Sequence, residues 1–216
     1  MVMQDTAITG ALEYVKDIFK NEFSGHDYFH TLRVFKMASR IAECENADVR
    51  VAQLAAILHD VDDRKLSPET CEKQTRARSF LASIDTDEAV VEQVCRIIRE
   101  ISFSANGDKR PTSLEGMCVQ DADRLDAIGA IGIARAFAYG GSRQRLMYDP
   151  DVEPKLNMSK EEYAKSESTT VNHFYEKLFK LTDLMNTDAA KEIARRREEY
   201  MREFIAEFMD EWDGIK

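Results

Sequence analysis

Apolar residues recur every three or four positions along most of the chain, and this spacing constrains the fold more than any other feature. In the segment from Thr6 to Glu22 they form one stripe, made of Ile8, Leu12, Val15, Ile18 and Phe19. Such a stripe is typical of an amphipathic helix that buries one face. No segment alternates convincingly between polar and apolar residues, and 9 Gly with 4 Pro among 216 residues are too few for the turns of a β-sandwich or barrel. The sequence therefore predicts an all-α protein, with a length that suits one well-buried core.

The other expected helices follow the first along the chain. They cover residues 27–43, 48–61, 68–84, 85–101, 114–139, 159–184 and 188–212, and the main loops are 102–112 and 142–158. Asp48 is a candidate N-cap, because an Asp side chain accepts hydrogen bonds from the unpaired N–H groups of a first helical turn. Gly140 and Gly141 are expected to end the helix at 114–139. Gly129 and Gly132, inside that helix, are expected to allow close helix packing.

The charge balance bears on the kind of partner. The chain has 40 acidic and 30 basic residues, a net charge of −10. Broad nucleic-acid binding needs a basic surface that neutralises phosphates, so no nucleic-acid partner is expected. A small anionic substrate is still compatible with this charge, because a metal ion and a few local cations can reverse the sign inside one cleft.

Cysteine usage and the apolar runs favour a cytoplasmic protein. The four cysteines lie far apart without a CxxC pair, as expected for reduced thiols: Cys44, Cys71, Cys95 and Cys118. The first ten residues have neither a basic region nor an apolar run of a signal peptide. The most apolar stretch, Ala127 to Ala138, is too short to span a bilayer, so no membrane partner is expected.

Two polar residues, His59 and Asp60, end the apolar run LAAILHD. Burying an imidazole and a carboxylate costs several kcal/mol unless something pairs with them. A divalent cation would satisfy both groups, since imidazole and carboxylate are common ligands of such ions. A hydrogen-bonded core pair without a metal is the alternative, and it is the more common arrangement for a lone His beside a lone Asp. His30 and Asp123, taken with this pair, favour the metal.

These residues lie in segments that resemble the HD superfamily of metal-dependent phosphohydrolases, whose signature is H…HD…D. The matching segments are GHDYFHTLRV (25–34), AAILHDVDDRK (55–65) and DADRLDAIGA (121–130). The chain is most similar to small single-domain bacterial HD hydrolases, some of which are nucleotide pyrophosphohydrolases. That subgroup also has a block like STTVNHFYEKLFKL (168–181). The resemblance implies a single HD-type helical bundle over residues 1–216, with a C-terminal helical extension, about 159–213, packed on it.

The resemblance implies that one divalent metal ion is held by His30, His59, Asp60 and Asp123. It selects Asp123 over Asp121 and Asp126 nearby, which are expected to be supporting or capping groups; the residues alone leave the three open. Two His and two carboxylates leave positions of an octahedral ion free for water and substrate, as a catalytic metal requires. Mn²⁺ is the expected ion, with Mg²⁺, Fe²⁺, Co²⁺, Ni²⁺ or Zn²⁺ as alternatives.

Two further residues are candidates for proton transfer. Asp63 lies four residues after His59, so a continuing helix would place both on one face. The resemblance implies a catalytic acidic residue at this position, which would orient or deprotonate the attacking water; a surface or capping carboxylate is the alternative. Asp62 is expected to be solvated. His26, one turn before His30, is a candidate supporting group or proton donor to the leaving oxygen, or a cap of its helix.

Phosphate recognition needs cationic or donor groups near the metal. The resemblance favours Lys65, His173 and Lys177, of which the last two would share a helix face at positions i and i+4. Most Lys and Arg residues in any protein only solvate the surface, and this is the alternative for each. Other candidates are Arg33, Arg64, Arg124, Lys109 and Arg110.

The expected activity is metal-dependent hydrolysis of a small phosphorylated substrate, favoured to be a nucleoside triphosphate cleaved to monophosphate and pyrophosphate. The alternatives are a phosphomonoesterase or phosphodiesterase, and a non-catalytic metal-bound HD sensor. A di-iron oxidase is less favoured, because such centres need more ligands and this chain has only 4 His. The chain is compatible with a homodimer.

Overall fold

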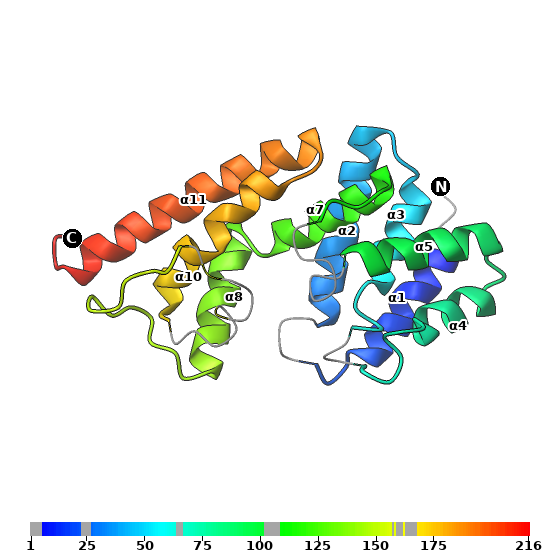
Figure 1. The fold of residues 1–216 in the computed structure, drawn as a ribbon, viewed down its shortest axis with the longest axis horizontal. Coiled ribbons are helices and arrows are strands. Elements are labelled where there is room, and N and C mark those ends of the chain that lie inside the picture. Colours follow the sequence, from blue (N-terminus) through cyan, green and yellow to red (C-terminus); the bar gives the residue numbers. More distant parts are fainter. Residues whose placement is uncertain are drawn as a thin grey trace. The chain divides into compact units, whose positions relative to one another are not determined.

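The computed structural model describes residues 6–22, 27–63, 67–101, 109–156, 158, 162 and 168–216. Over these residues it has nine α-helices, one 3₁₀-helix and no strand (Figure 1). This confirms the all-α fold class. In the same part of the chain, no helix is long and apolar enough to cross a membrane.

The chain divides into two compact units. The first contains Met1–Asp123 and Asn186–Ala189, and the second contains Arg124–Met185 and Ala190–Lys216. The single domain over residues 1–216, with 159–213 packed on it, stays a prediction. The boundary at Asp123 matters for function, because it leaves all four expected metal ligands in the first unit.

The first unit is built around α3 (Val49–Leu58), an apolar helix whose second half is fully buried. Three helices pack on it: α1 (Thr6–Ile18), α2 (Tyr28–Glu45) and α5 (Glu88–Ile101). The amphipathic stripe predicted at the N-terminus is thus explained, since α1 buries Ile8 and Val15. A helix as apolar as α3 has to be covered on several sides, and the three neighbours supply that cover.

Aspartates begin two of these helices. The Asp48 side chain accepts a hydrogen bond from the backbone N–H of Val51 at 3.0 Å, which confirms its predicted role as N-cap of α3. Asp27 caps α2 in the same way by accepting from the N–H of His30 at 2.7 Å. This cap places His30 in the first turn of α2, so a short local interaction sets where a candidate ligand leaves the backbone.

The helix expected at 68–84 is shorter in the structure. Residues 68–74 form turns, and α4 (Thr75–Ser83) begins only after Gln74, whose φ of 51° is left-handed. Gln74 provides no side-chain cap. Asp62 does so from outside the helix, accepting from the N–H groups of Arg76 and Ala77 at 3.2 and 2.9 Å. A long-range carboxylate therefore sets the start of α4.

The single helix expected at 114–139 is wrong, because the chain breaks at Ala127 and Ile128. It forms α7 (Leu114–Asp126) and α8 (Gly129–Ser142). At the break Gly129 has a φ of +75°, and a Cβ on Gly132 would lie 2.3 Å from the Ala127 carbonyl oxygen. Both glycines therefore permit the sharp bend and the close approach that follows it.

The glycine pair expected to stop this helix lies inside α8, which continues to Ser142. A Cβ on Gly140 would lie 2.3 Å from the Thr170 hydroxyl oxygen, so this glycine allows a close helix contact. That contact joins α8 to α10 (Thr170–Glu176).

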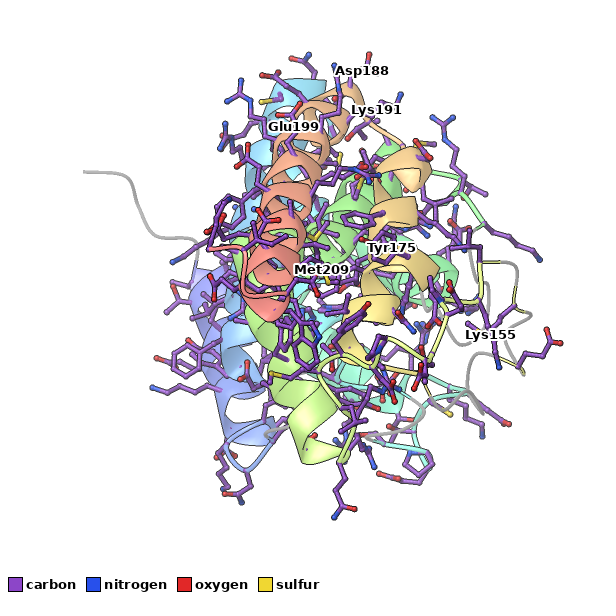
Figure 2. All side chains as sticks on the ribbon, turned by 90° about the vertical axis from the view of Figure 1, so that its left-hand side faces the viewer. Lys155, Tyr175, Asp188, Lys191, Glu199 and Met209 are labelled. Carbon is purple, nitrogen blue, oxygen red and sulfur yellow. The ribbon has the colours of Figure 1, made fainter. Side chains whose placement is uncertain are left out.

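The second unit is organised around aromatic side chains. Phe137 of α8 and Phe174 of α10 meet Phe204 and Phe208 of α11 (Asp188–Trp212), with ring centroids 5.9–6.4 Å apart. The predicted helix at 188–212 is confirmed by α11. Tyr175 and Met209, labelled in Figure 2, line a cavity of about 230 Å³ in this unit.

The helix expected at 159–184 is interrupted over its described part. There α10 ends at Glu176, and a 3₁₀-helix, η1 (Leu178–Leu184), follows Lys177. Most of residues 159–167 lie outside the described residues. Because Lys177 is the C-cap of α10, with φ −139° and ψ −55°, the backbone changes direction at that residue.

Candidate metal centre

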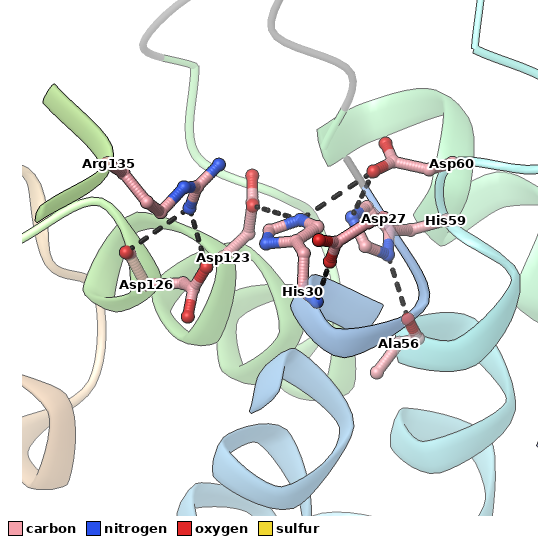
Figure 3. A network of polar contacts seen from close by, with 8 residues as sticks. All are labelled: Asp27, His30, Ala56, His59, Asp60, Asp123, Asp126 and Arg135. Atoms are coloured by element: carbon pink, nitrogen blue, oxygen red, sulfur yellow. Dashed lines mark hydrogen bonds and ion pairs between the residues drawn. The ribbon is translucent and has the colours of Figure 1, made fainter. Parts of the chain in front are cut away.

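His30 lies at the centre of a buried polar cluster in the first unit. Its side chain is 1% exposed, and its Nε2 atom faces two carboxylates (Figure 3). The distance from Nε2 to Oδ2 of Asp60 is 3.6 Å, and the distance to Oδ1 of Asp123 is 3.4 Å. The helix cap at Asp27 and the buried face of α2 thus direct one imidazole nitrogen toward acidic groups from two other segments.

His59 and Asp60 lie in the turn that follows α3, where His59 is the C-cap. The Nε2 atom of His59 lies 3.1 Å from Oδ2 of Asp60, and the His30 and His59 rings meet edge to face with centroids 5.4 Å apart. One ligand atom from each of His30, His59 and Asp60 lies within 4.8 Å of the others. These three residues form a possible metal site, as predicted from their sequence context.

The second ring nitrogen of His59 makes a hydrogen bond of the kind that metal-binding histidines commonly make. Its Nδ1 atom lies 2.8 Å from the carbonyl oxygen of Ala56, so Nδ1–H donates to that acceptor. Metal-binding histidines commonly donate their second N–H to such a group, which orients the ring and leaves Nε2 for the metal. In the neutral ring the Nε2 lone pair would face the Asp60 carboxylate, an unfavourable pairing unless a cation lies between them.

The pKa of His59 also indicates that its surroundings favour a positive charge. Burial lowers the pKa of the ring, but the Asp60 and Asp123 carboxylates and the Ala56 carbonyl together raise it to about 10. The surroundings therefore favour a cation at this ring by more than burial disfavours one. A divalent ion bound by His30, His59 and Asp60 would supply that charge, so the donor set fits the metal.

Asp123 occupies the open side of the cluster. It lies on α7, and its side chain is 41% exposed, whereas the Asp60 side chain is 10% exposed. The other two aspartates of this segment have different partners. Asp121 accepts hydrogen bonds from Asn186 and Thr187, and Asp126 pairs with Arg135 at 2.5 Å, as Figure 3 also shows. Asp123, whose carboxylate meets His30, remains the predicted fourth ligand.

The turn after α3 changes the expectation for two further acidic residues. Because α3 ends at Leu58, His59 and Asp63 do not share a helix face, and the helical argument for Asp63 fails. Asp63 is half-buried, and its N–H donates to the Asp60 carbonyl at 3.1 Å. Its role as base stays a prediction. The expectation that Asp62 is solvated is wrong, because it is 6% exposed and caps α4.

The residues expected to contact phosphate lie in different parts of the chain. Lys65, together with the candidate acid His26, lies outside the described residues. His173 lies on α10 in the second unit, and Lys177 follows that helix, with its N–H donating to the His173 carbonyl at 3.0 Å. Lys177 is the C-cap of α10, so the helix ends at this residue, and the shared face of the pair stays a prediction. Arg124 is not available at the surface, because it is buried and donates to the Leu184 carbonyl.

His173 differs from the histidines of the cluster. Burial, with the positive charges of Lys177 and Arg145, lowers its pKa to about 3. It is therefore neutral near pH 7 and could serve a phosphate only as a hydrogen-bond donor. Arg145 was not predicted from the sequence, because it lies in the connection after α8, where no helical spacing relates it to His173.

Comparisons with known proteins agree with this geometry. An HD domain model matches residues 27–128, the span that contains all four expected ligands. The Bacillus subtilis protein YpgQ is 36% identical over 204 residues, which cover 94% of this chain and 92% of YpgQ.

Solved structures extend the likeness over nearly the whole chain. An HD-superfamily hydrolase from Bacillus thuringiensis is 42% identical with a TM-score of 0.79, and the match covers 98% of this chain and 99% of that one. YpgQ in complex with ADP matches with 34% identity and a TM-score of 0.77, covering 95% of each chain. An HD domain implies a divalent metal, and the buried His30, His59 and Asp60 are suited to hold it. The chain belongs to the HD superfamily and is an HD-superfamily hydrolase.

Proposed function

We propose that this protein is a metal-dependent phosphohydrolase that cleaves nucleoside triphosphates to a monophosphate and pyrophosphate. The observation that carries the proposal is the buried cluster of two imidazoles and a carboxylate, with a second carboxylate on its open side. The nucleotide is supported by YpgQ, which has been crystallised with ADP. ADP shares its base, ribose and first two phosphates with a triphosphate, so it supports the ligand class and not the position of the cut.

His30, His59, Asp60 and Asp123 would hold the metal ion. When bound, a divalent cation supplies positive charge to a phosphate oxygen and lowers the pKa of a coordinated water; Mn²⁺ is the ion that we propose. Asp63 orients the attacking water and accepts its proton. The water oxygen forms a bond to the α-phosphorus, the bond from that phosphorus to the bridging oxygen breaks, and pyrophosphate leaves.

Donor groups are needed to bind the three linked phosphates. We propose Lys65, His173 and Lys177 for this role, with His26 as proton donor to the leaving oxygen. A triphosphate carries more charge than one divalent ion neutralises, so it requires more such contacts than a phosphomonoester does. The Lys177 and Arg145 charges that act on His173 support an anion-binding role for this part of the second unit.

Product analysis tests the proposal. Protein purified without chelators is analysed for metal, supplied with Mn²⁺, and incubated with each nucleoside triphosphate and with small phosphomonoesters, with products followed by phosphorus NMR. We expect a monophosphate and pyrophosphate. Diphosphate with inorganic phosphate would move the cut to the terminal phosphate, and rapid hydrolysis of monoesters alone would make the protein a phosphatase. Metal binding without turnover of any substrate would favour a sensor module.

A further inference from the structure

The segment Asn186–Ala189, which precedes and begins α11, belongs to the first unit although the chain on both sides of it belongs to the second. Its attachment is a set of hydrogen bonds to Asp121 of α7. The Asp121 carboxylate accepts from the Asn186 N–H at 2.9 Å, the Asn186 side-chain amide at 2.8 Å, and the N–H and hydroxyl of Thr187, each at 2.8 Å. Both carboxylate oxygens of Asp121 are thereby satisfied.

Because Asp121 is buried, its hydrogen bonds strongly constrain the position of α7 against the segment Asn186–Ala189. The residue is 0% exposed, and a carboxylate without hydrogen-bond partners costs several kcal/mol in such surroundings. The donors from Asn186 and Thr187 offset that cost only in one arrangement of α7 and the segment. The Asn186 amide also donates to the Gln120 side chain at 2.9 Å, which adds a second point of attachment on α7.

The same segment reaches the helix that carries His30. The N–H of Ala189 donates to the side chain of Glu45, the last residue of α2, at 2.9 Å. The segment thus bonds to α7 through Asp121 and to α2 through Glu45. These two helices carry Asp123 and His30, whose Oδ1 and Nε2 atoms lie 3.4 Å apart.

Helix geometry relates Asp121 to the expected fourth ligand. Residues two positions apart on an α-helix point about 200° apart, so Asp121 and Asp123 project from nearly opposite faces of α7. The segment therefore holds α7 from the face opposite His30. Asp123 needs such support, because its own side chain is 41% exposed and contributes little burial to its position.

We propose that Asn186 and Thr187 are positioning residues for the metal centre, which hold Asp121 and so keep Asp123 beside His30. The inference rests on the metal site of the proposed function. It gives the turn before α11 a role in metal binding, although that turn follows Asp123 by more than sixty residues and contains no ligand. Groups hydrogen-bonded directly to metal ligands typically change metal affinity by about 10–100-fold when they are removed, and we expect the lower end of that range here because the contact acts through α7.

The test measures Mn²⁺ affinity of the full-length protein from the electron paramagnetic resonance signal of free Mn²⁺. The combined change Asn186→Ala and Thr187→Val should weaken binding by about tenfold. Thr187→Val alone, which keeps most of the bonds to Asp121, should weaken it by a smaller factor, and Thr187→Ser should bind as the wild type does. Thr86→Val is the matched control, because the Thr86 hydroxyl is buried and has no hydrogen-bond partner among the described residues; its affinity should not change.

A double-mutant cycle separates positioning from a general loss of structure. If the segment acts through Asp123, then adding the Asn186→Ala and Thr187→Val changes to Asp123→Ala should weaken Mn²⁺ binding no further than Asp123→Ala alone. The same fold loss in both backgrounds, or unchanged affinity of every segment variant with helical circular dichroism retained, would overturn the inference. Should the combined variant not fold, the single Thr187 variants carry the same comparison. Failure of the wild type to bind Mn²⁺ would instead remove the metal site and this inference with it.

Discussion

His59 in the first unit is buried and His173 in the second is half-buried, and their pKa values move in opposite directions. Burial lowers the pKa of each ring, and the neighbouring charges decide the result. Two carboxylates raise the pKa of His59 to about 10, whereas Lys177 and Arg145 add to burial and lower the pKa of His173 to about 3. The first unit thus holds its imidazole where a cation is favoured, and the second holds one where a cation is excluded.

This difference suits the two units to separate chemical tasks in the proposed function. The first presents acidic groups and imidazoles that attract a metal ion. In the second, the charges of Lys177 and Arg145 act on a neutral imidazole, a setting that favours an anion over a metal. An enzyme acting on a polyphosphate requires both kinds of group, so the contrast supports the proposed function. Four experiments test this contrast, in order of decreasing expected effect.

The largest effect is expected from removing the His59 imidazole. His59→Ala should abolish bound Mn²⁺ and hydrolysis while helical circular dichroism survives, because the cluster loses one of its buried donors. His173→Ala is the matched control and should keep its metal. Metal content is measured on protein purified without chelators. Full occupancy and activity in His59→Ala, or equal metal loss in both variants, would contradict the assignment.

The next largest effect is expected from changing the proposed general base, Asp63. Asp63→Asn should retain Mn²⁺ but lower kcat by about 10²–10⁴-fold, the usual contribution of a general acid or base. Asp62→Asn is the control from the neighbouring position: its single amide oxygen can still accept one of the two backbone hydrogen bonds that begin α4, and its kcat should stay near that of the wild type. If Asp63→Asn lost its metal together with its activity, Asp63 would be a ligand instead.

A smaller effect is expected in the second unit. Lys177→Ala should raise KM for a nucleoside triphosphate by roughly tenfold, and by less for a monoester, because loss of one phosphate contact removes about 1–2 kcal/mol. Lys155→Ala, an exposed lysine of the same unit (Figure 2), should leave KM unchanged. Steady-state kinetics on both substrates provide the comparison. An equal rise for the two substrates would show that Lys177 does not serve the additional phosphates.

The smallest effect concerns stability. The folded chain keeps His173 neutral down to a pKa of about 3, whereas an unfolded histidine binds a proton near 6.5. Below pH 6.5 the unfolded state therefore binds more protons, and the stability due to this residue is lost as pH falls toward 3. Between pH 7 and pH 5 the free energy of unfolding should fall by about 1–2 kcal/mol from this source.

Urea unfolding at both pH values measures this loss. His173→Gln, which cannot titrate there, should show a smaller decrease in the free energy of unfolding than the wild type. Equal decreases in the two proteins would mean that His173 is protonated in the folded chain, and the contrast with His59 would disappear.

Local patterns were sufficient for much of the fold and for the position of the candidate site. Helical spacing of apolar residues predicted α1, α2, α3, α5 and α11, because a helix must bury one stripe whatever it packs against. Asp48 was predicted as a cap because capping involves only neighbouring backbone groups. His30, His59 and Asp60 were expected to meet, and the structure brings their ligand atoms within 4.8 Å.

Contacts between distant residues decided what spacing alone could not. Asp62 is expected from the sequence to be solvated, but it is buried and accepts hydrogen bonds from the distant Arg76 and Ala77. The break between α7 and α8 depends on a left-handed Gly129, a conformation that no apolar pattern encodes. The opposite pKa shifts of His59 and His173, and the hold of Asn186 and Thr187 on Asp121, exist only once the chain has folded. Helical spacing and caps act over a few neighbouring residues, whereas charge environments and long-range hydrogen bonds require the tertiary structure.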